Sequence, residues 1–242
     1  MDVHMLHFYP DLMNLYGSCA NLLALGRYLT ALGCTVTMNP VRPGDAADFT
    51  HADFLYMGAG TERRAEAAMT DFARFAPELK AAVSDGMAVL FAGTAMELLG
   101  KEIRRADGGA YAGTGLADFR TERQKTRTVG DVYGRTALFP EPVVGFLNTC
   151  GKMAGVETPL LESTELGVGN SLTPGPEGFH WKNVFASQLT GPLLVKNPKL
   201  LETVAAAIYA RRGQTLPAER PRDEWAEKAY AVTEEQLRLR IK

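Results

Sequence analysis

Two glycine-bearing turns, each directly after a short apolar run, are the stretches best suited to hold a reacting group. Gly58-Ala59-Gly60 follows the run FLYM, and residues 89–100 read VLFAGTAMELLG. Glycine lets a backbone turn sharply and approach a ligand closely, and a strand that turns abruptly into a helix commonly presents a nucleophile in α/β enzymes. The tip of the second turn, residues 92–95, offers one polar side chain, the hydroxyl of Thr94.

Cysteine and histidine side chains are the other candidates for nucleophilic, basic or metal-binding chemistry. The three cysteines are far apart in the sequence and form neither a CxxC motif nor a Cys/His cluster with zinc spacing: Cys19, Cys34 and Cys150. We therefore expect no metal site and no cofactor. A sparse, odd number of cysteines favours a reducing compartment over a disulfide framework. His4 and His7 alternate along an apolar segment, which is typical of residues in a sheet.

Composition excludes several classes of function. The 242 residues are 46% hydrophobic and carry a net charge of -2, without a basic face interleaved with aromatic residues, so no nucleic-acid partner is expected. The acidic start MDVHMLHFYP does not read as a signal peptide. No window approaches the ~18 apolar residues of a membrane span, so no membrane insertion is expected. These features predict a soluble, cytoplasmic protein.

The elements needed to position the two turns follow an α/β alternation. Apolar and β-branched runs predict strands at residues 3–9, 34–38, 54–57 and 88–91, and helical periodicity predicts helices at residues 20–32 and 62–84 and after the second turn. This alternation is typical of a parallel sheet covered on both faces. Ligands bind such sheets at the carboxyl ends of the strands, so we expect both glycine turns to face one crevice.

The second half of the chain has a different pattern. Residues 101–178 predict short strand-like pieces, clearest at 128–133 and 143–147, and residues 183–194 are expected to return toward the crevice. A helix at 197–211 and a Pro-containing linker at 214–222 precede a charged helical tail at 223–242. We expect one domain over residues 1–212, followed by a linker and tail over residues 213–242.

Several motifs resemble a known family and occur in that family's order. They are YPDLMNLYG at 9–17, GAGTE at 58–62, GFLN at 145–148, GVGN at 167–170 and GPLLVKNP at 191–198. Together they resemble the CobB/CobQ-type class I glutamine amidotransferases, and in particular the glutaminase subunits of lipid II isoglutaminyl synthases. The resemblance implies a three-layer α/β sandwich with a mostly parallel central sheet and flavodoxin-like topology.

The same resemblance implies a reaction that this sequence is poorly equipped to perform. In the family, a cysteine thiolate attacks the glutamine amide, a histidine activates the cysteine, and backbone N–H groups stabilise the oxyanion. Alignment of the family's CGGYQLLG on Leu98-Leu99-Gly100 places the cysteine on Gly93, and its YLHGPLL histidine falls on Thr190. Neither residue can take over the lost role, so we expect no intact catalytic pair.

Three residues could compensate for this loss. Thr94 is either a displaced hydroxyl nucleophile or, as we favour, a small polar N-cap of the elbow helix. Cys150, in NTCG, is either a relocated thiol nucleophile or, as we favour, a buried and inert cysteine. His180 is either a compensating base or an ordinary turn or surface histidine.

Residues around the crevice could still bind a ligand. The backbone of Gly58, Ala59 and Gly60 could offer donors to an anion, or simply form a tight turn. Arg127, in TRTVG, resembles the family's RxxGD arginine and could contact glutamine or a partner, or be a solvated strand-edge charge. Glu62 and Arg63 suit the solvated first turn of a helix equally well.

These observations favour a noncatalytic glutaminase-like subunit of a heterodimer. By resemblance, its partner would be a Mur-ligase-like amidating synthetase of the peptidoglycan branch. The alternatives are an active glutaminase with Cys150 as a relocated nucleophile, a component of a cobyric-acid-synthase-like amidotransferase, or a module that binds glutamine or another small carboxylate without turnover.

Overall fold

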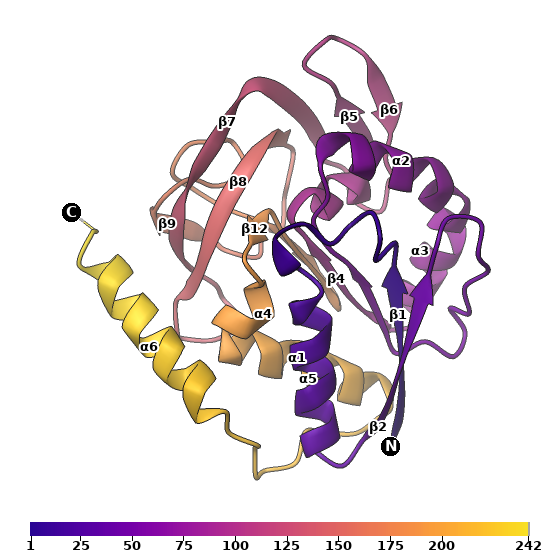
Figure 1. Ribbon diagram of the computed structural model, residues 1–242, viewed down its shortest axis with the longest axis vertical. Helices are drawn as coiled ribbons and strands as arrows, with labels where there is room; N and C mark the ends of the chain where they lie inside the picture. Colours follow the sequence, from indigo (N-terminus) through magenta and orange to yellow (C-terminus); the bar gives the residue numbers. More distant parts are fainter. Residues whose placement is uncertain (242) are drawn as a thin grey trace.

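A six-stranded sheet, which we call sheet A, forms the centre of the computed structural model, which describes residues 1–241 (Figure 1). Its strands stand in the order β10-β11-β4-β3-β1-β2, and all neighbours are parallel except β10 and β11. The bounds are β1 Asp2–Phe8, β2 Thr35–Val41, β3 Phe54–Met57, β4 Ala88–Ala92, β10 Phe179–Trp181 and β11 Val184–Ser187. The order of the parallel strands is the flavodoxin-like one.

Helices cover both faces of sheet A, which gives the three layers expected from the sequence. One face packs against α1 Ala20–Ala31, α4 Leu193–Lys196 and α5 Pro198–Arg211, and the other against α2 Glu62–Phe72 and α3 Ala76–Ser84. Every residue of β3 and β4 is buried. Strands buried on both faces read as continuous apolar runs, and this is why FLYM and AVLFA were recognisable as strands.

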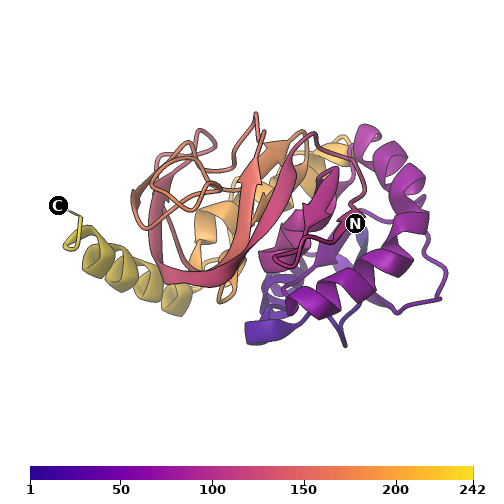
Figure 2. The same ribbon diagram turned by 90° about the horizontal axis from the view of Figure 1, so that it is seen from above.

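A second sheet, sheet B, stands beside the first and contains the longest strands (Figure 2). Its order is β12-β8-β7-β5-β6, with β9 paired to β7. The bounds are β5 Glu102–Arg104, β6 Ala110–Ala112, β7 Arg120–Arg135, β8 Val143–Ala154, β9 Ser163–Leu166 and β12 Leu189–Thr190. The two clearest pieces expected within residues 101–178, at 128–133 and 143–147, are parts of one long β7–β8 hairpin. The charged run RTERQKTR hid the strand because most of its side chains reach solvent.

Three segments depart from the sequence-based expectation. The helix expected over 62–84 is interrupted by a 3-10 turn at Ala73–Phe75, and Pro77 then occupies the first turn of α3, where a missing N–H is tolerated. The elbow after β4 is a 3-10 helix, η3, over Gly93–Leu99 rather than an α-helix. β2 continues through Pro40 to Val41, where a loop was expected; an edge strand tolerates proline.

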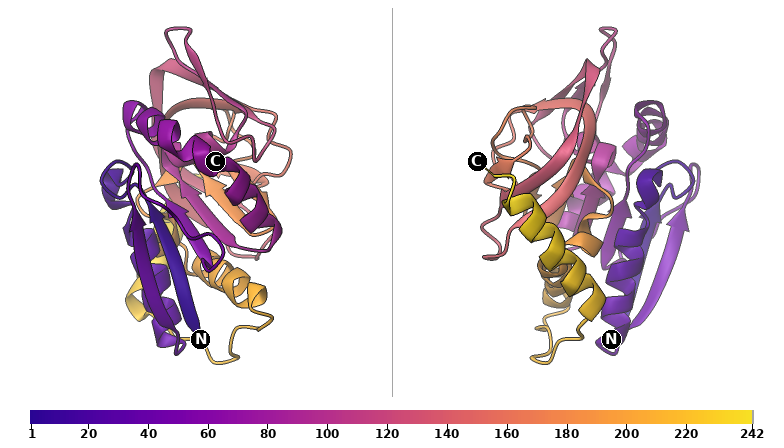
Figure 3. Two further views of the ribbon diagram at one scale, coloured as in Figure 1. Left: turned by 90° about the vertical axis from the view of Figure 1, so that its right-hand side faces the viewer. Right: turned by 60° about the vertical axis from the view of Figure 1, so that its left-hand side comes forward.

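The C-terminal helix α6, Glu224–Arg238, lies along the outer side of sheet B (Figure 3). The carboxylate of Asp223 caps it by accepting hydrogen bonds from the N–H groups of Trp225 and Ala226, at 3.1 and 3.0 Å. Its inner face packs Leu237 against Tyr133 and Val144. Within residues 1–241, no helix combines the length and apolar character needed to cross a bilayer.

Candidate functional site

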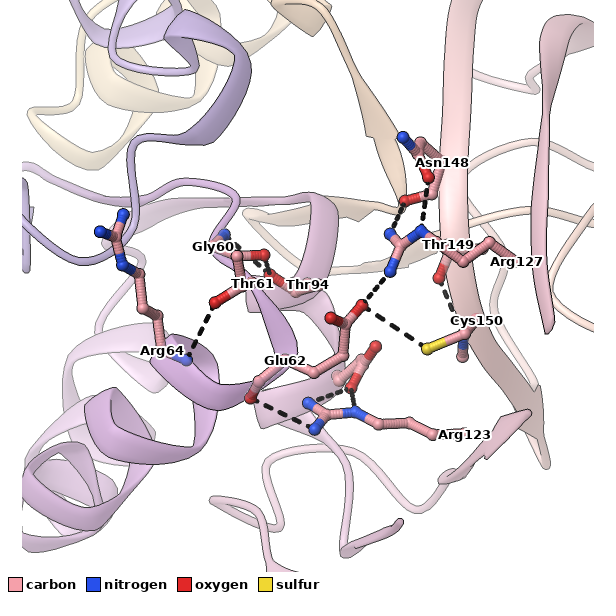
Figure 4. Close-up of polar contacts among 12 residues, drawn as sticks. Gly60, Thr61, Glu62, Arg64, Thr94, Arg123, Arg127, Asn148, Thr149 and Cys150 are labelled. Carbon is pink, nitrogen blue, oxygen red and sulfur yellow. Dashed lines mark hydrogen bonds and ion pairs between the residues drawn. The ribbon is translucent and has the colours of Figure 1, made fainter. Parts of the chain in front are cut away.

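The two glycine turns meet at the carboxyl ends of β3 and β4, as the sequence predicted. The Gly60 N–H donates to Thr94 Oγ1 at 2.9 Å, and the Thr94 hydroxyl donates back to the Gly60 carbonyl, also at 2.9 Å (Figure 4). Thr94 is therefore not the N-cap of the elbow: the capping position is Ala92, and no side chain caps it. The hydroxyl of Thr94 joins the turns and is itself fully engaged.

Gly93 lies against both the other glycine turn and β12. Its φ of +64° is in the left-handed region, which glycine adopts at little cost. A Cβ added at Gly93 would lie 2.6 Å from the Cβ of Ala59 and 3.2 Å from Cγ2 of Thr190. The positions to which the resemblance assigned the nucleophile, the oxyanion loop and the base are thus gathered in space. Methyl groups fill the space between them.

The backbone donors of the Gly58-Ala59-Gly60 turn are already used inside the protein. The Ala59 N–H donates to Ser18 Oγ at 3.0 Å, and the Gly60 N–H is taken by Thr94. A Cβ at position 58 would lie 2.0 Å from the same Ser18 oxygen, so only glycine fits there. Two donors that could stabilise an oxyanion are therefore committed to holding the loop.

Arg127 extends from β7 toward Glu62 and Asn148, and all three of its guanidinium nitrogens are engaged (Figure 4). Its Nε and Nη2 donate to Oδ1 and the carbonyl of Asn148, both at 2.7 Å, and Nη1 lies 2.5 Å from Glu62 Oε1. Burial alone would raise the pKa of the Glu62 carboxyl, but the hydrogen bond and charge of Arg127 hold it below its ordinary value. An ionised Glu62 thus neutralises the arginine.

Cys150 lies beside this ion pair and is buried. Its thiol donates to Glu62 Oε1 at 3.5 Å. Burial, followed by the negative charges of Glu62 and Glu97, raises the pKa of the Cys150 thiol to about 11. The thiol is therefore protonated near neutral pH, whereas reactive cysteines have a lowered pKa.

His180 lies apart from Cys150, in the other sheet. It is on β10 at the edge of sheet A, with its ring centroid 4.9 Å from that of Phe185. Burial lowers the pKa of His180, and no hydrogen bond joins it to Cys150 within the described part of the chain. The two residues considered together as a replacement pair are thus not brought together.

A buried ion pair beneath the crevice was missed by the sequence reasoning. Arg123 on β7 lies 2.8 Å from Glu97 of η3, and both side chains are almost completely buried. Arg123 also donates to the hydroxyl of Tyr111 at 2.8 Å and to the Glu62 carbonyl at 3.3 Å. It therefore ties the elbow to the start of α2. The sequence offered one signal for this ion pair, because Glu97 is the single charged residue within the apolar AMELLG turn.

A second buried carboxyl supports the strand that carries Thr190. Glu177 accepts hydrogen bonds from the Ser187 hydroxyl at 2.9 Å and the Gln188 N–H at 2.7 Å. Complete burial raises the pKa of Glu177 to about 7 despite these hydrogen bonds. Glu177 thus fixes the backbone just before β12.

Solved structures with a similar fold include other glutamine amidotransferases. The structure of PurLQS from Thermotoga maritima has a TM-score of 0.51 and 14% identity, and the match covers 87% of this chain and 97% of that one. A glutamine amidotransferase from Thermotoga maritima also has a TM-score of 0.51, with 10% identity over 98% of this chain and 95% of that one. These likenesses confirm the predicted class I glutamine amidotransferase-like fold.

Sequence comparison places the chain more narrowly. It is 30% identical over 224 residues to the lipid II isoglutaminyl synthase (glutamine-hydrolyzing) subunit GatD of Streptococcus pneumoniae, covering 89% of this chain and 84% of that protein. It is 29% identical over 207 residues to the subunit of the same name from Staphylococcus aureus, covering 86% and 84%. The family described as the CobB/CobQ-like glutamine amidotransferase domain matches residues 4–198. The chain therefore belongs to the CobB/CobQ-like glutamine amidotransferase family.

Proposed function

We propose that this protein is a noncatalytic, GatD-like subunit that keeps the amidotransferase fold but does not hydrolyse glutamine. The observation that carries the proposal is the environment of Gly93. The backbone of Gly93 is in the left-handed region, but Gly93 has no side chain. The methyl groups of Ala59 and Thr190 occupy the space around it. A nucleophile is absent from the elbow, and the room for one has been filled.

The surrounding contacts support the same proposal. The N–H groups of Ala59 and Gly60 are hydrogen-bonded to side chains of this chain rather than left for an oxyanion. Arg127, the group best suited to bind a carboxylate, already holds Glu62. Glutamine would have to displace an internal ion pair in order to reach the arginine. We therefore favour loss of turnover over non-hydrolytic binding of a small carboxylate.

We propose that the partner is a Mur-ligase-like amidating synthetase that acts on lipid II. The support is similarity to two proteins named as subunits of lipid II isoglutaminyl synthase over most of the chain. The chain would hold the synthetase in its active shape, and the complex would take free ammonia. We therefore favour a role in the cell-wall branch over a cobyric-acid-synthase-like role.

Glutamate release by the purified chain tests the loss of hydrolysis. The assay would use the chain alone and together with the candidate synthetase, beside Cys150→Ala in both settings. We expect no release in any sample. Release that disappears in Cys150→Ala would show that Cys150 is a relocated nucleophile, and release that persists in the variant would also overturn the proposal.

Amidation by the complex tests the role of the partner. We expect amidated lipid II to form from the synthetase with this chain when ammonium is the nitrogen source, and not when glutamine replaces ammonium. We also expect less product from the synthetase alone at the same ammonium concentration. Equal product with and without this chain would contradict a supporting role.

A further inference from the structure

Helix α6 has an outer face that the rest of the molecule does not cover. Its inner face carries Tyr230 and Leu237, which pack against sheet B. On the opposite side, Trp225 and Val232 of α6, and Leu239 directly after its last residue, are 81%, 60% and 68% exposed. These three residues are seven apart, so they lie on one line along the helix. We call this set the α6 stripe.

The α6 stripe is more apolar than a solvated helix face requires. Among the described residues, one charged group interacts with the stripe: the ammonium of Lys228 lies 5.3 Å from the centroid of the Trp225 ring. Figures 2 and 3 show α6 along the outer flank of the molecule, with its outer side directed away from sheet B. Apolar side chains seven residues apart occupy one position of a heptad repeat, and such a position can face a partner helix.

We propose that the α6 stripe pairs with the same stripe of a second copy of this chain, in an antiparallel arrangement about a two-fold axis at Val232. Val232 lies midway between Trp225 and Leu239. Antiparallel pairing therefore places the two valines together and each tryptophan against the leucine of the other copy. A two-fold interface must be self-complementary in this way.

The charges beside the stripe favour this orientation. Lys228 and Glu235 are exposed on the same flank of the stripe, four residues before and three residues after Val232. Antiparallel pairing brings Lys228 of one copy beside Glu235 of the other, and symmetry makes this contact twice. Parallel pairing would instead place Ala229 and Gln236 opposite these charges. Such rim pairs add little affinity but select orientation.

The size of the helix limits the strength of the dimer. Fifteen residues span only about 22 Å, so one helix pair buries less area than the roughly 1,200 Å² of a standard stable interface. The expected species is therefore a weak dimer that forms as protein concentration rises, and not an obligate one. Because the stripe lies on α6, outside the crevice, its pairing does not depend on whether the crevice is catalytic.

Analytical ultracentrifugation of the full chain over a wide concentration range tests the proposal. We expect the weight-average mass to rise from the monomer value of 26.3 kDa toward twice that value. Val232→Asp places two carboxylates across the axis and should raise the Kd at least about tenfold. Val129→Asp is the matched control, because Val129 is similarly exposed at 57% but lies on β7. It should leave the Kd unchanged.

A charge exchange tests the orientation independently. Lys228→Glu should weaken self-association, and adding Glu235→Lys to it should restore most of the loss. A constant monomer mass, or a dimer that Val232→Asp does not weaken, would overturn the proposal. If the chain stays monomeric and Val232→Asp instead abolishes binding to the candidate synthetase, the stripe belongs to that partner and the self-pairing is wrong.

Discussion

At the scale of single residues, contacts within the chain fill the space between the two glycine turns and β12. Where a cysteine and a histidine are expected by resemblance, the chain has Gly93 and Thr190, and Gly93 lies against both Thr190 and Ala59. The sequence identified these positions, but it could not show that the methyl group of one residue fills the space of another. That result depends on three segments more than thirty residues apart in the chain.

This packing predicts that restoring the nucleophile alone will fail. Gly93→Cys should show no glutamate release, because its Cβ would lie 2.6 Å from that of Ala59. Only the combination of Gly93→Cys, Ala59→Gly and Thr190→His should release glutamate, and a thiol-directed glutamine analogue should then label position 93. Release by the single variant would show that the space is available. An inactive triple variant would show that these three positions do not account for the loss.

The carboxyl of Glu62 contributes to the raised thiol pKa of Cys150. Burial is the largest cause of the raised thiol pKa of about 11, and the negative charge of Glu62 comes next. Glu62→Gln removes this charge and should lower the pKa, so Cys150 should be alkylated faster at pH 8 to 9. Mass spectrometry of the labelled peptide would give the rate. Glu66→Gln, on the same helix, is the control, and equal rates in both variants would contradict the assignment.

At the scale of elements, strands buried on both faces were predicted best. FLYM was assigned as a strand to the residue, because a run without polar residues in this context has few alternatives. The β7–β8 hairpin was recognised only in fragments, since the exposed side of β7 carries charges that break the apolar pattern. The contacts that hold the crevice, such as Arg123 with Glu97, join separate elements. No local pattern specifies them.

The difference in burial between Leu237 and Leu239 predicts which side of α6 holds the helix against sheet B. Leu237 is buried against Tyr133 and Val144, whereas Leu239, two residues on, is 68% exposed. Leu237→Ala should therefore lower the free energy of unfolding by about 2 kcal/mol, and Leu239→Ala by less than about 0.5 kcal/mol. Denaturant unfolding at low protein concentration would measure both. Similar losses would show that α6 is not docked by this face. The division of the chain into one domain over residues 1–212 and a linker and tail over residues 213–242 stays a prediction.

At the scale of the whole molecule, buried Glu177 and half-buried His7 make stability depend on pH in opposite directions. Glu177 has a pKa raised to about 7 by burial, so the native state retains a proton that the unfolded chain releases. The contribution of protonated Glu177 to the stability of the native state is complete below its ordinary pKa of 4.5, and it is lost as pH rises through 7. Burial lowers the pKa of His7 to about 4. The stabilisation from neutral His7 is present above 6.5 and is lost as pH falls toward 4.

Because these two effects overlap between pH 4.5 and 6.5, they partly cancel in the native protein, and single variants should separate them. Glu177→Gln keeps a neutral group beside Ser187 and leaves the His7 effect, so its stability should rise from pH 4.5 to 7. His7→Asn removes the His7 effect, so its slope over the same interval should be more negative than that of the native protein, in which burial of His180 acts in the same direction as burial of His7. Each effect is at most on the order of 3 kcal/mol. Denaturant unfolding at several pH values would measure the slopes. A Glu177→Gln slope that is not more positive than the native one, or a His7→Asn slope that is not more negative, would contradict the effect assigned to that group.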